Sequence, residues 1–256
     1  MLNLIRMDLY RMHRGMGFKV TLILAALFAI AMTPFGWAMT QLGNLFADTQ
    51  IPFDKTAPLA GILSDPFPFV NAMLALIAAG NFFFADIEFG YIKNIAGQMP
   101  KRGYTVLSRY IASMVQCLLF MAVGMIGNLI GTAILQRITL EGNLLGSLRI
   151  LALRFLLLQA CSAILLLFAA GFRTKSLTTV MAVLMGSGLL YLVYTGIDLG
   201  VSRLFPKKGF SISDYMPDQL LGAANPKTLD ALIVSAVTIG VFLPLSIRLF
   251  DKRDVK

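Results

Sequence analysis

The most patterned polar segment of the chain lies between Phe82 and Ile111, in the middle of a long apolar region. It contains two acidic and four basic residues, namely Asp86, Glu88, Lys93, Lys101, Arg102 and Arg109. Ionised groups are costly among lipid tails, so we expect residues 86–109 to form a solvent-facing loop between two membrane spans. Such a loop could recognise a partner protein through ion pairs.

Apolar side chains alternate with these charges at Phe89, Tyr91, Ile92, Ile95 and Met99. A purely solvated connection has no need of exposed apolar side chains, and this favours docking of the loop against a partner. The alternative is a solvated loop whose positive charges only hold it on the cytoplasmic side of the membrane.

The sequence lacks the residue patterns of the common catalytic sites. The segment FRTKS at 172–176 lacks the glycines of a phosphate-binding loop. The single histidine, His13, leaves no Ser-His-Asp triad or hydrolytic metal site. Cys117 and Cys161 lie in apolar runs, where cysteine behaves as a small hydrophobic residue. We therefore expect no enzymatic activity and no cofactor bound by this chain.

Composition identifies the class of protein that must hold these side chains in place. Of the 256 residues, 57% are hydrophobic and only 14% are charged, and the mean hydropathy is +0.77. Such values are typical of a multi-span membrane protein and not of a soluble domain. The net charge of +9 is explained by basic cytoplasmic loops, and no separate basic module points to nucleic-acid binding.

The hydrophobic runs predict an all-α integral membrane protein with a single transmembrane domain over 1–256. We expect six transmembrane helices, at about 18–39, 66–85, 110–135, 148–170, 177–197 and 228–250. Apolar residues and three prolines mix in the connection from Val201 to Lys227. This mixture predicts short external half-helices between the fifth and sixth spans.

Residues Leu2 to Met16 predict an amphipathic helix that lies on the membrane surface. Its apolar face would carry Leu2, Ile5, Leu9, Met12 and Met16, and its basic face Arg6, Arg11 and Arg14. A basic tail that only sets the topology is the alternative.

Two features of the spans predict specific packing. Gly124, Gly127 and Gly131 lie on nearly one face of the third span, where small residues permit close helix contact in lipid. The spacing leaves open whether that contact is within the chain or across a dimer, and within the chain is the simpler expectation. Arg154, several residues inside the fourth span, either extends to the headgroups, which we favour, or faces a polar interior.

The positive-inside rule sets the expected orientation. With six spans, both termini lie on one side of the membrane. If that side is the cytoplasm, the cytoplasmic segments hold most of the 22 Lys and Arg residues, close to the span ends where the rule acts. We therefore expect both termini, and the loop at 86–109, to be cytoplasmic.

The charged segment resembles one found in a known family. Glu88, Gly90, Ile92 and Lys93 are followed by a basic turn, Pro100 to Arg102, and by a helix that re-enters the membrane at Leu107 to Arg109. Together with the six-span layout, this run resembles the permease subunit of a type 2 ATP-binding-cassette exporter. The compact layout is similar to permeases of bacteriocin and antimicrobial-peptide export or immunity.

The resemblance implies a set of contacts and partners. The loop would form a coupling helix in a groove of a separate ATPase subunit, which would bind the ATP and Mg. The implied contact residues are Glu88, Tyr91, Ile92, Lys93, Asn94, Lys101, Arg102, Arg173 and Lys175. Tyr191 and Tyr194 would lie at the translocation path or at the interface with a second permease copy. The resemblance also implies a bacterial plasma membrane as the location.

The function that follows is outward transport of a hydrophobic or amphipathic substrate, most simply a peptide, driven by the separate ATPase. A different class of function is a membrane sensor or scaffold that binds a peptide and signals to a partner without transporting it. The absence of a nucleotide-binding motif fits both, because in each case this chain acts through a partner.

Overall fold

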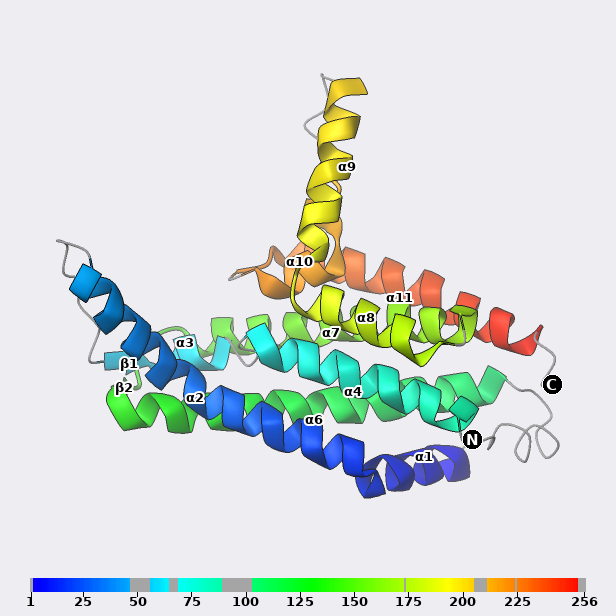
Figure 1. Cartoon of the computed structure of the whole chain (residues 1–256), viewed down its shortest axis with the longest axis horizontal. Helices are drawn as coiled ribbons and strands as arrows, with labels where there is room; N and C mark the ends of the chain where they lie inside the picture. Colours follow the sequence, from blue (N-terminus) through cyan, green and yellow to red (C-terminus); the bar gives the residue numbers. More distant parts are fainter. Residues whose placement is uncertain are drawn as a thin grey trace.

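The apolar runs form long helices that lie side by side in the computed structural model (Figure 1). The structure describes residues 2–46, 56–64, 69–88, 103–172, 174–204, 211–223 and 225–252. The longer helices are α1 (Leu2–Arg14), α2 (Met16–Phe46), α4 (Phe69–Glu88), α6 (Gly103–Leu135), α7 (Leu144–Phe172), α8 (Lys175–Gly186), α9 (Leu190–Leu204) and α11 (Thr228–Asp251). The short elements are β1 (Thr56–Pro58), α3 (Leu59–Ser64), β2 (Arg137–Thr139), a 3₁₀ turn (Ser213–Tyr215) and α10 (Pro217–Gly222).

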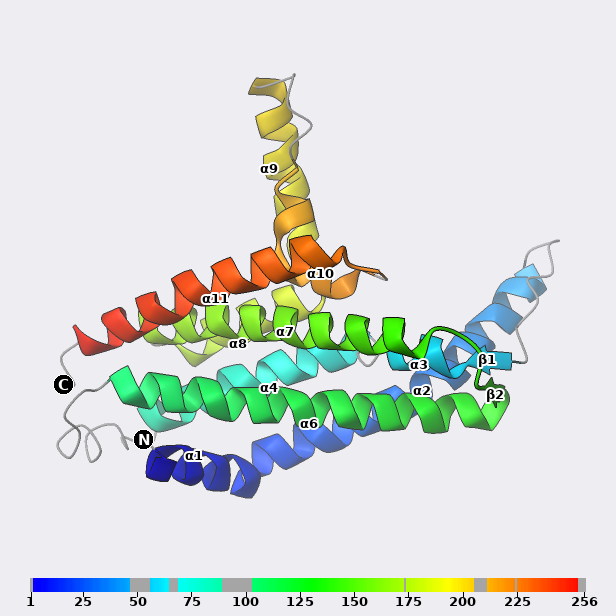
Figure 2. The ribbon, with the colours of Figure 1, turned by 180° about the vertical axis from the view of Figure 1, so that it is seen from behind.

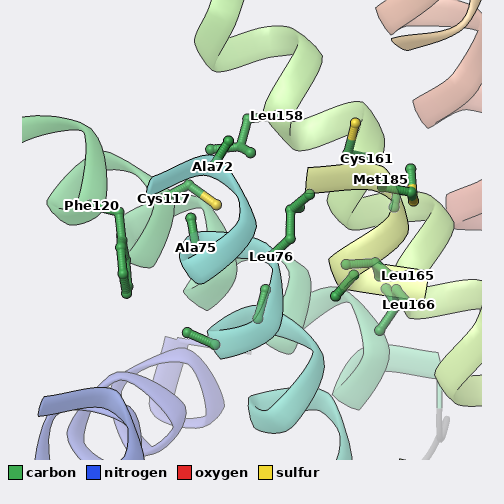
Figure 3. Close-up of a cluster of buried hydrophobic side chains, with 14 of the residues drawn as sticks. Ala72, Ala75, Leu76, Cys117, Phe120, Leu158, Cys161, Leu165, Leu166 and Met185 are labelled. Carbon is green, nitrogen blue, oxygen red and sulfur yellow. The ribbon is translucent and has the colours of Figure 1, made fainter. Parts of the chain in front are cut away.

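The core lies between α4, α6, α7 and α8. Figure 3 shows buried side chains from these four helices meeting around α4, among them Leu76, Phe120, Cys161 and Met185. The helices α2 and α11 pack on the outside of this core, α2 against α6 and α11 against α7. The side chains of α2 and α11 that point away from the bundle are large and apolar, as expected for a surface in contact with lipid.

Four helices are long and apolar enough to cross a membrane, over Met16–Leu42, Gly103–Leu135, Leu144–Phe172 and Thr228–Asp251. The bent pair α8 and α9 would make a fifth span if the two helices cross together. The described residues thus support an all-α membrane protein with four or five spans. The predicted second span corresponds to α4, whose apolar part, Val70–Phe84, is shorter than a typical span of about 20 residues.

The helices on both sides of the predicted loop at 86–109 extend into it. α4 extends to Glu88, and α6 begins at Gly103, seven residues before the predicted third span. Arg109 is therefore a helical residue, and it is only 4% exposed. Its charge is accommodated by protein contacts and not by solvent, a possibility that hydropathy alone does not reveal. Residues 89–102 lie outside the described part of the chain.

The predicted fifth span, 177–197, is not one straight helix. α8 ends at Gly186 and α9 begins at Leu190, and the two helices meet at an angle of 76°. Gly188 lies in the break with φ of 68°, a backbone conformation that glycine adopts without strain. Because α8 has 12 residues, its length is about 18 Å, too short to cross a bilayer core alone. α9 projects away from the bundle in both views (Figure 2).

The glycine face of α6 packs against α2 of the same chain, which confirms the expected close contact within the chain. A Cβ atom at Gly127 would lie 2.6 Å from the Cβ of Ala29, and one at Gly131 would lie 2.3 Å from the carbonyl oxygen of Ile30. Only glycine allows the two backbones to approach this closely.

A parallel pair of short strands, β1 and β2, closes the bundle at the end where α6 stops and α7 begins. This strand pair was not among the elements predicted from the sequence. Ser147, in the first turn of α7, donates a hydrogen bond to the carbonyl of Ala60 at 2.7 Å, which fixes α3 to the same end.

Candidate functional site

Two of the residues predicted to contact a partner ATPase belong to the described part of the chain. Glu88 is the last residue of α4, and Lys175 is the exposed first residue of α8. The others lie outside the described residues, namely Tyr91, Ile92, Lys93, Asn94, Lys101, Arg102 and Arg173. The structure therefore describes the helices on both sides of the predicted contact.

These helices end together, near the start of α1 and the end of α11 (Figure 1). A Cβ atom at Gly103, the first residue of α6, would lie 2.6 Å from Cγ2 of Ile247 and 3.1 Å from Oδ2 of Asp251 in α11. The guanidinium of Arg109 lies over the ring of Phe250, 5.7 Å from its centre. We call this end of the bundle, where α1, the start of α6 and the end of α11 meet, the termini end.

A buried acidic residue fastens α1 at the termini end. Asp8 is 1% exposed, and its Oδ2 accepts a hydrogen bond from the Ser108 hydroxyl of α6 at 2.5 Å. Its Oδ1 lies 3.7 Å from Nη1 of Arg11. Burial raises the pKa of Asp8, and the Ser108 hydroxyl and the cations Arg109 and Arg11 oppose that shift.

The amphipathic face of α1 differs from the predicted one. Its buried residues are Leu4, Asp8 and Met12, whereas Leu2 and Met16 are exposed. Asp8 takes part in the packed face because Ser108, far away in the sequence, meets it there. Of the predicted basic face, Arg6 and Arg14 are exposed, while Arg11 forms the ion pair with Asp8.

A second group of polar side chains lies at the break between α8 and α9. A pocket of about 340 Å³ opens there, lined by Ala72, Met185, Gly188, Asp218, Gln219 and Leu221 among others. We call it the kink pocket. Asp218, in the first turn of α10, is 4% exposed, and burial raises its pKa. The Tyr194 hydroxyl donates to Oδ1 of Asp218 at 3.3 Å, and Nε2 of Gln219 donates to Oδ2 at 2.8 Å.

The fourth span supplies a further contact at this place. Arg154 of α7 is 5% exposed, and its Nη2 donates to the carbonyl of Ala223, a residue of the pocket wall, at 3.2 Å. The expectation that Arg154 extends to the headgroups is therefore wrong, and the polar-interior alternative is correct. The backbone after α10 provides the acceptor, which the sequence of α7 alone does not indicate.

Of the two tyrosines predicted at a path or interface, Tyr194 contacts Asp218, a residue that lines the kink pocket. Tyr191 is 52% exposed on α9. Asp218 and Gln219 were missed by the sequence analysis, because they lie in the mixed connection after α9. Pro217 before an acidic residue is a helix-start signal that could have drawn notice to this place.

The polar groups at these two places can bind a ligand or a partner through charge and hydrogen bonds. Among the described residues, no group of three or more His, Cys, Asp or Glu side chains could hold a metal ion. The kink pocket offers one carboxylate in a largely apolar wall, and the termini end offers basic side chains around a buried ion pair.

Comparison with known proteins does not identify the chain. No protein-family model matches it, and no curated protein matches it either. The resemblance to exporter permeases therefore rests on the residues of the sequence alone.

Proposed function

We propose that this chain is the membrane-spanning subunit of an exporter that couples ATP hydrolysis by a separate ATPase to outward movement of a hydrophobic or amphipathic peptide. One observation carries the proposal beyond the sequence resemblance. The helices that flank the charged segment, α4 and α6, end at the termini end, where α1 and α11 are fastened to α6 by Asp8 and Arg109. A force applied there would reach several long helices at once.

We count six spans by adding α4 to the five formed by α2, α6, α7, the α8–α9 pair and α11. The apolar part of α4, Val70–Phe84, is shorter than a typical span, but most of its side chains are buried by neighbouring helices and do not face lipid. Basic residues of the described chain gather at the termini end, namely Arg6, Arg14, Lys175, Arg248 and Lys252. By the positive-inside rule, this end faces the cytoplasm of a bacterial plasma membrane, with α1 on its surface.

The proposed mechanism is a shift between two arrangements of the helices, driven from outside the chain. The ATPase would bind the segment between Glu88 and Gly103, with a smaller contact near Lys175, and a second permease copy would complete the transporter. Closure of the ATPase would favour the outward-facing arrangement because the ATPase binds that arrangement more tightly. ATP and Mg belong to the partner and not to this chain.

Charge reversal tests the ATPase contact. We expect Lys101→Glu with Arg102→Glu, or Lys93→Glu, to release the ATPase from the purified complex, because each change places a negative charge where the proposal has a positive one. The control is a double reversal of Arg137 and Arg149, two exposed basic residues near the opposite end of the bundle. It should leave the ATPase bound.

Equal recovery of the ATPase with both double variants would contradict the proposed contact. The sensor or scaffold alternative gives a different result in the same preparation. It predicts that a peptide alters the binding of a partner that has no nucleotide site, and that no peptide crosses the membrane. Both outcomes are read from the co-purified protein and from peptide accumulation in vesicles.

A further inference from the structure

The carboxylate of Asp218 is buried without a matching positive charge among the described residues. The side chains that donate hydrogen bonds to it, Tyr194 and Gln219, are neutral. No lysine, arginine or histidine of the described chain lies within ion-pair distance of it. Burying an unpaired carboxylate is costly, so such a group is usually paired, protonated or placed for a ligand.

The surroundings of Asp218 form a site of defined size and polarity. The kink pocket, about 340 Å³, falls at the small end of the range of roughly 300 to 1,000 Å³ that is common for ligand pockets. Ala72, Met185 and Leu221 give it apolar walls, and the exposed Gly222 lies at its edge. This volume suits one headgroup or side chain with a short apolar stem.

The end of α8 adds to the negative character of the pocket. α8 stops at Gly186, and Met185, Gly186 and Gly188 all line the pocket. The last carbonyl groups of a helix carry partial negative charge and favour a cation nearby. The C-terminal residues of α8 and the Asp218 carboxylate of α10 therefore line the same pocket.

The other charged or titratable groups that the structure describes near Asp218 do not neutralise it. Tyr194 of α9 is a neutral donor, and the Cys161 thiol of α7 carries no positive charge. Arg154 of α7 reaches the pocket wall by donating to the Ala223 carbonyl. That contact holds the segment after α10 in place, and the carboxylate stays available.

We propose that the kink pocket binds a primary ammonium group carried on an apolar chain, with the Asp218 carboxylate as its counter-ion. An ammonium donates up to three hydrogen bonds, and the Asp218 carboxylate is the charged acceptor in the pocket. Its methylene stem contacts Met185 and Leu221. A hard divalent cation fits poorly, because it needs about six oxygen ligands and one carboxylate supplies at most two.

The inference does not depend on the proposed ATPase, since binding is a property of this chain alone. A lysine side chain of a peptide and the amino headgroup of a lipid share the required chemistry. The experiment uses the purified full chain in phosphatidylcholine nanodiscs and a water-soluble probe, hexylammonium, with hexan-1-ol as the uncharged comparison. Binding is measured as the rise in melting temperature with probe concentration, which follows from linkage.

We expect a saturable rise in melting temperature with hexylammonium and a much smaller one with hexan-1-ol. In Asp218→Asn the apparent affinity for hexylammonium should fall at least about tenfold, because a buried charge pair is lost. Asp214→Asn, which changes an exposed carboxylate in the neighbouring 3₁₀ turn, should bind as the wild type does. Equal affinity in Asp218→Asn, or equal responses to the two probes, would overturn the proposal.

A measurement on the unaltered chain decides the matter if Asp218→Asn fails to fold. A photoreactive hexylammonium analogue should label residues of the kink pocket, such as Met185 or Leu221, and labelling confined to other residues overturns the proposal. Competition then distinguishes the natural source. Displacement of the probe by phosphatidylethanolamine in the nanodisc identifies a lipid, displacement by a leucyl-lysine amide identifies a peptide, and displacement by neither contradicts the site.

Discussion

Asp8 shows how one buried side chain links the start of the chain to its bundle. It is the only acidic residue of α1, and it is buried against Ser108 at the beginning of α6. The hydrogen bond and the nearby cations make the buried carboxylate tolerable, but burial still raises its pKa. Asp8 is therefore protonated more easily when α1 is docked than when it is undocked.

This contact predicts a pH dependence of stability with a defined sign. The pKa of Asp8 in the docked helix lies above its ordinary value of 3.8, so the docked state binds more protons than the undocked state. The resulting stabilisation is full below that ordinary value and is lost as the pH rises through the raised pKa. Between about pH 4 and about pH 7, the melting temperature in detergent should fall less with rising pH in Asp8→Asn than in the wild type.

An exposed carboxylate provides the control for this experiment. Asp214→Asn should keep the pH dependence of the wild type, because Asp214 is exposed. If Asp8→Asn and Asp214→Asn gave the same curve, another group would have to be responsible for the pH dependence.

Arg154 provides a second prediction at this scale. In Arg154→Met, the Ala223 carbonyl loses its charged donor. The amides of α10 should then exchange with solvent roughly tenfold faster, the equivalent of about 1.4 kcal/mol, which is within the range for a hydrogen bond to a charged group. Hydrogen exchange read by mass spectrometry over residues 217–223 checks this. Arg149→Met, at an exposed position on the same helix, should leave that exchange unchanged.

Among the elements, the contact between α2 and α6 depends most clearly on particular residues. The glycines at 127 and 131 bring the two backbones so close that an added methyl group has no room. Helices in lipid gain much of their association from such close packing, because lipid tails and apolar side chains are equally apolar. The outer helix α2 is therefore held to the core through a narrow line of small residues.

Gly131→Ala tests this packing directly. Its Cβ would meet the Ile30 carbonyl oxygen, so we expect a loss of about 1 to 3 kcal/mol in the free energy of unfolding. Gly240→Ala in α11 is the matched control, because a Cβ there has no neighbour within 4 Å. It should be neutral or add about 0.5 to 1 kcal/mol through better helix propensity. Similar losses in both variants would show that the close contact is not important for stability.

The sequence predicted the existence of these helices better than their ends and bends. Hydropathy located the apolar runs, and the glycine spacing on α6 indicated a close-packed face. Gly186 and Gly188 interrupt the apolar run from Leu177 to Ile197, but the bend between α8 and α9 was not predicted, because hydropathy carries no information on φ. The buried state of Asp8 and Arg154 was not predicted either, since their partners, Ser108 and Ala223, are distant in the sequence.

At the scale of the whole molecule, the two ends of the bundle differ in character. The termini end joins α1, α6 and α11 through polar and cation–aromatic contacts, and it carries exposed basic side chains. The β1–β2 pair lies at the other end, and α9 projects from the bundle between the two ends (Figure 1). In the proposed exporter, the partner acts on the first end, and the helices carry the movement toward the second.

The most direct test of this account is ATP hydrolysis by the complex that this chain forms in its native membrane. The full chain, isolated in mild detergent through a tag at Lys256, should bring with it a separate nucleotide-binding protein that hydrolyses ATP. A hydrophobic peptide that the complex exports should stimulate that hydrolysis, and Lys101→Glu with Arg102→Glu should abolish both the hydrolysis and the association. Isolation of the chain with no nucleotide-binding partner would contradict the account.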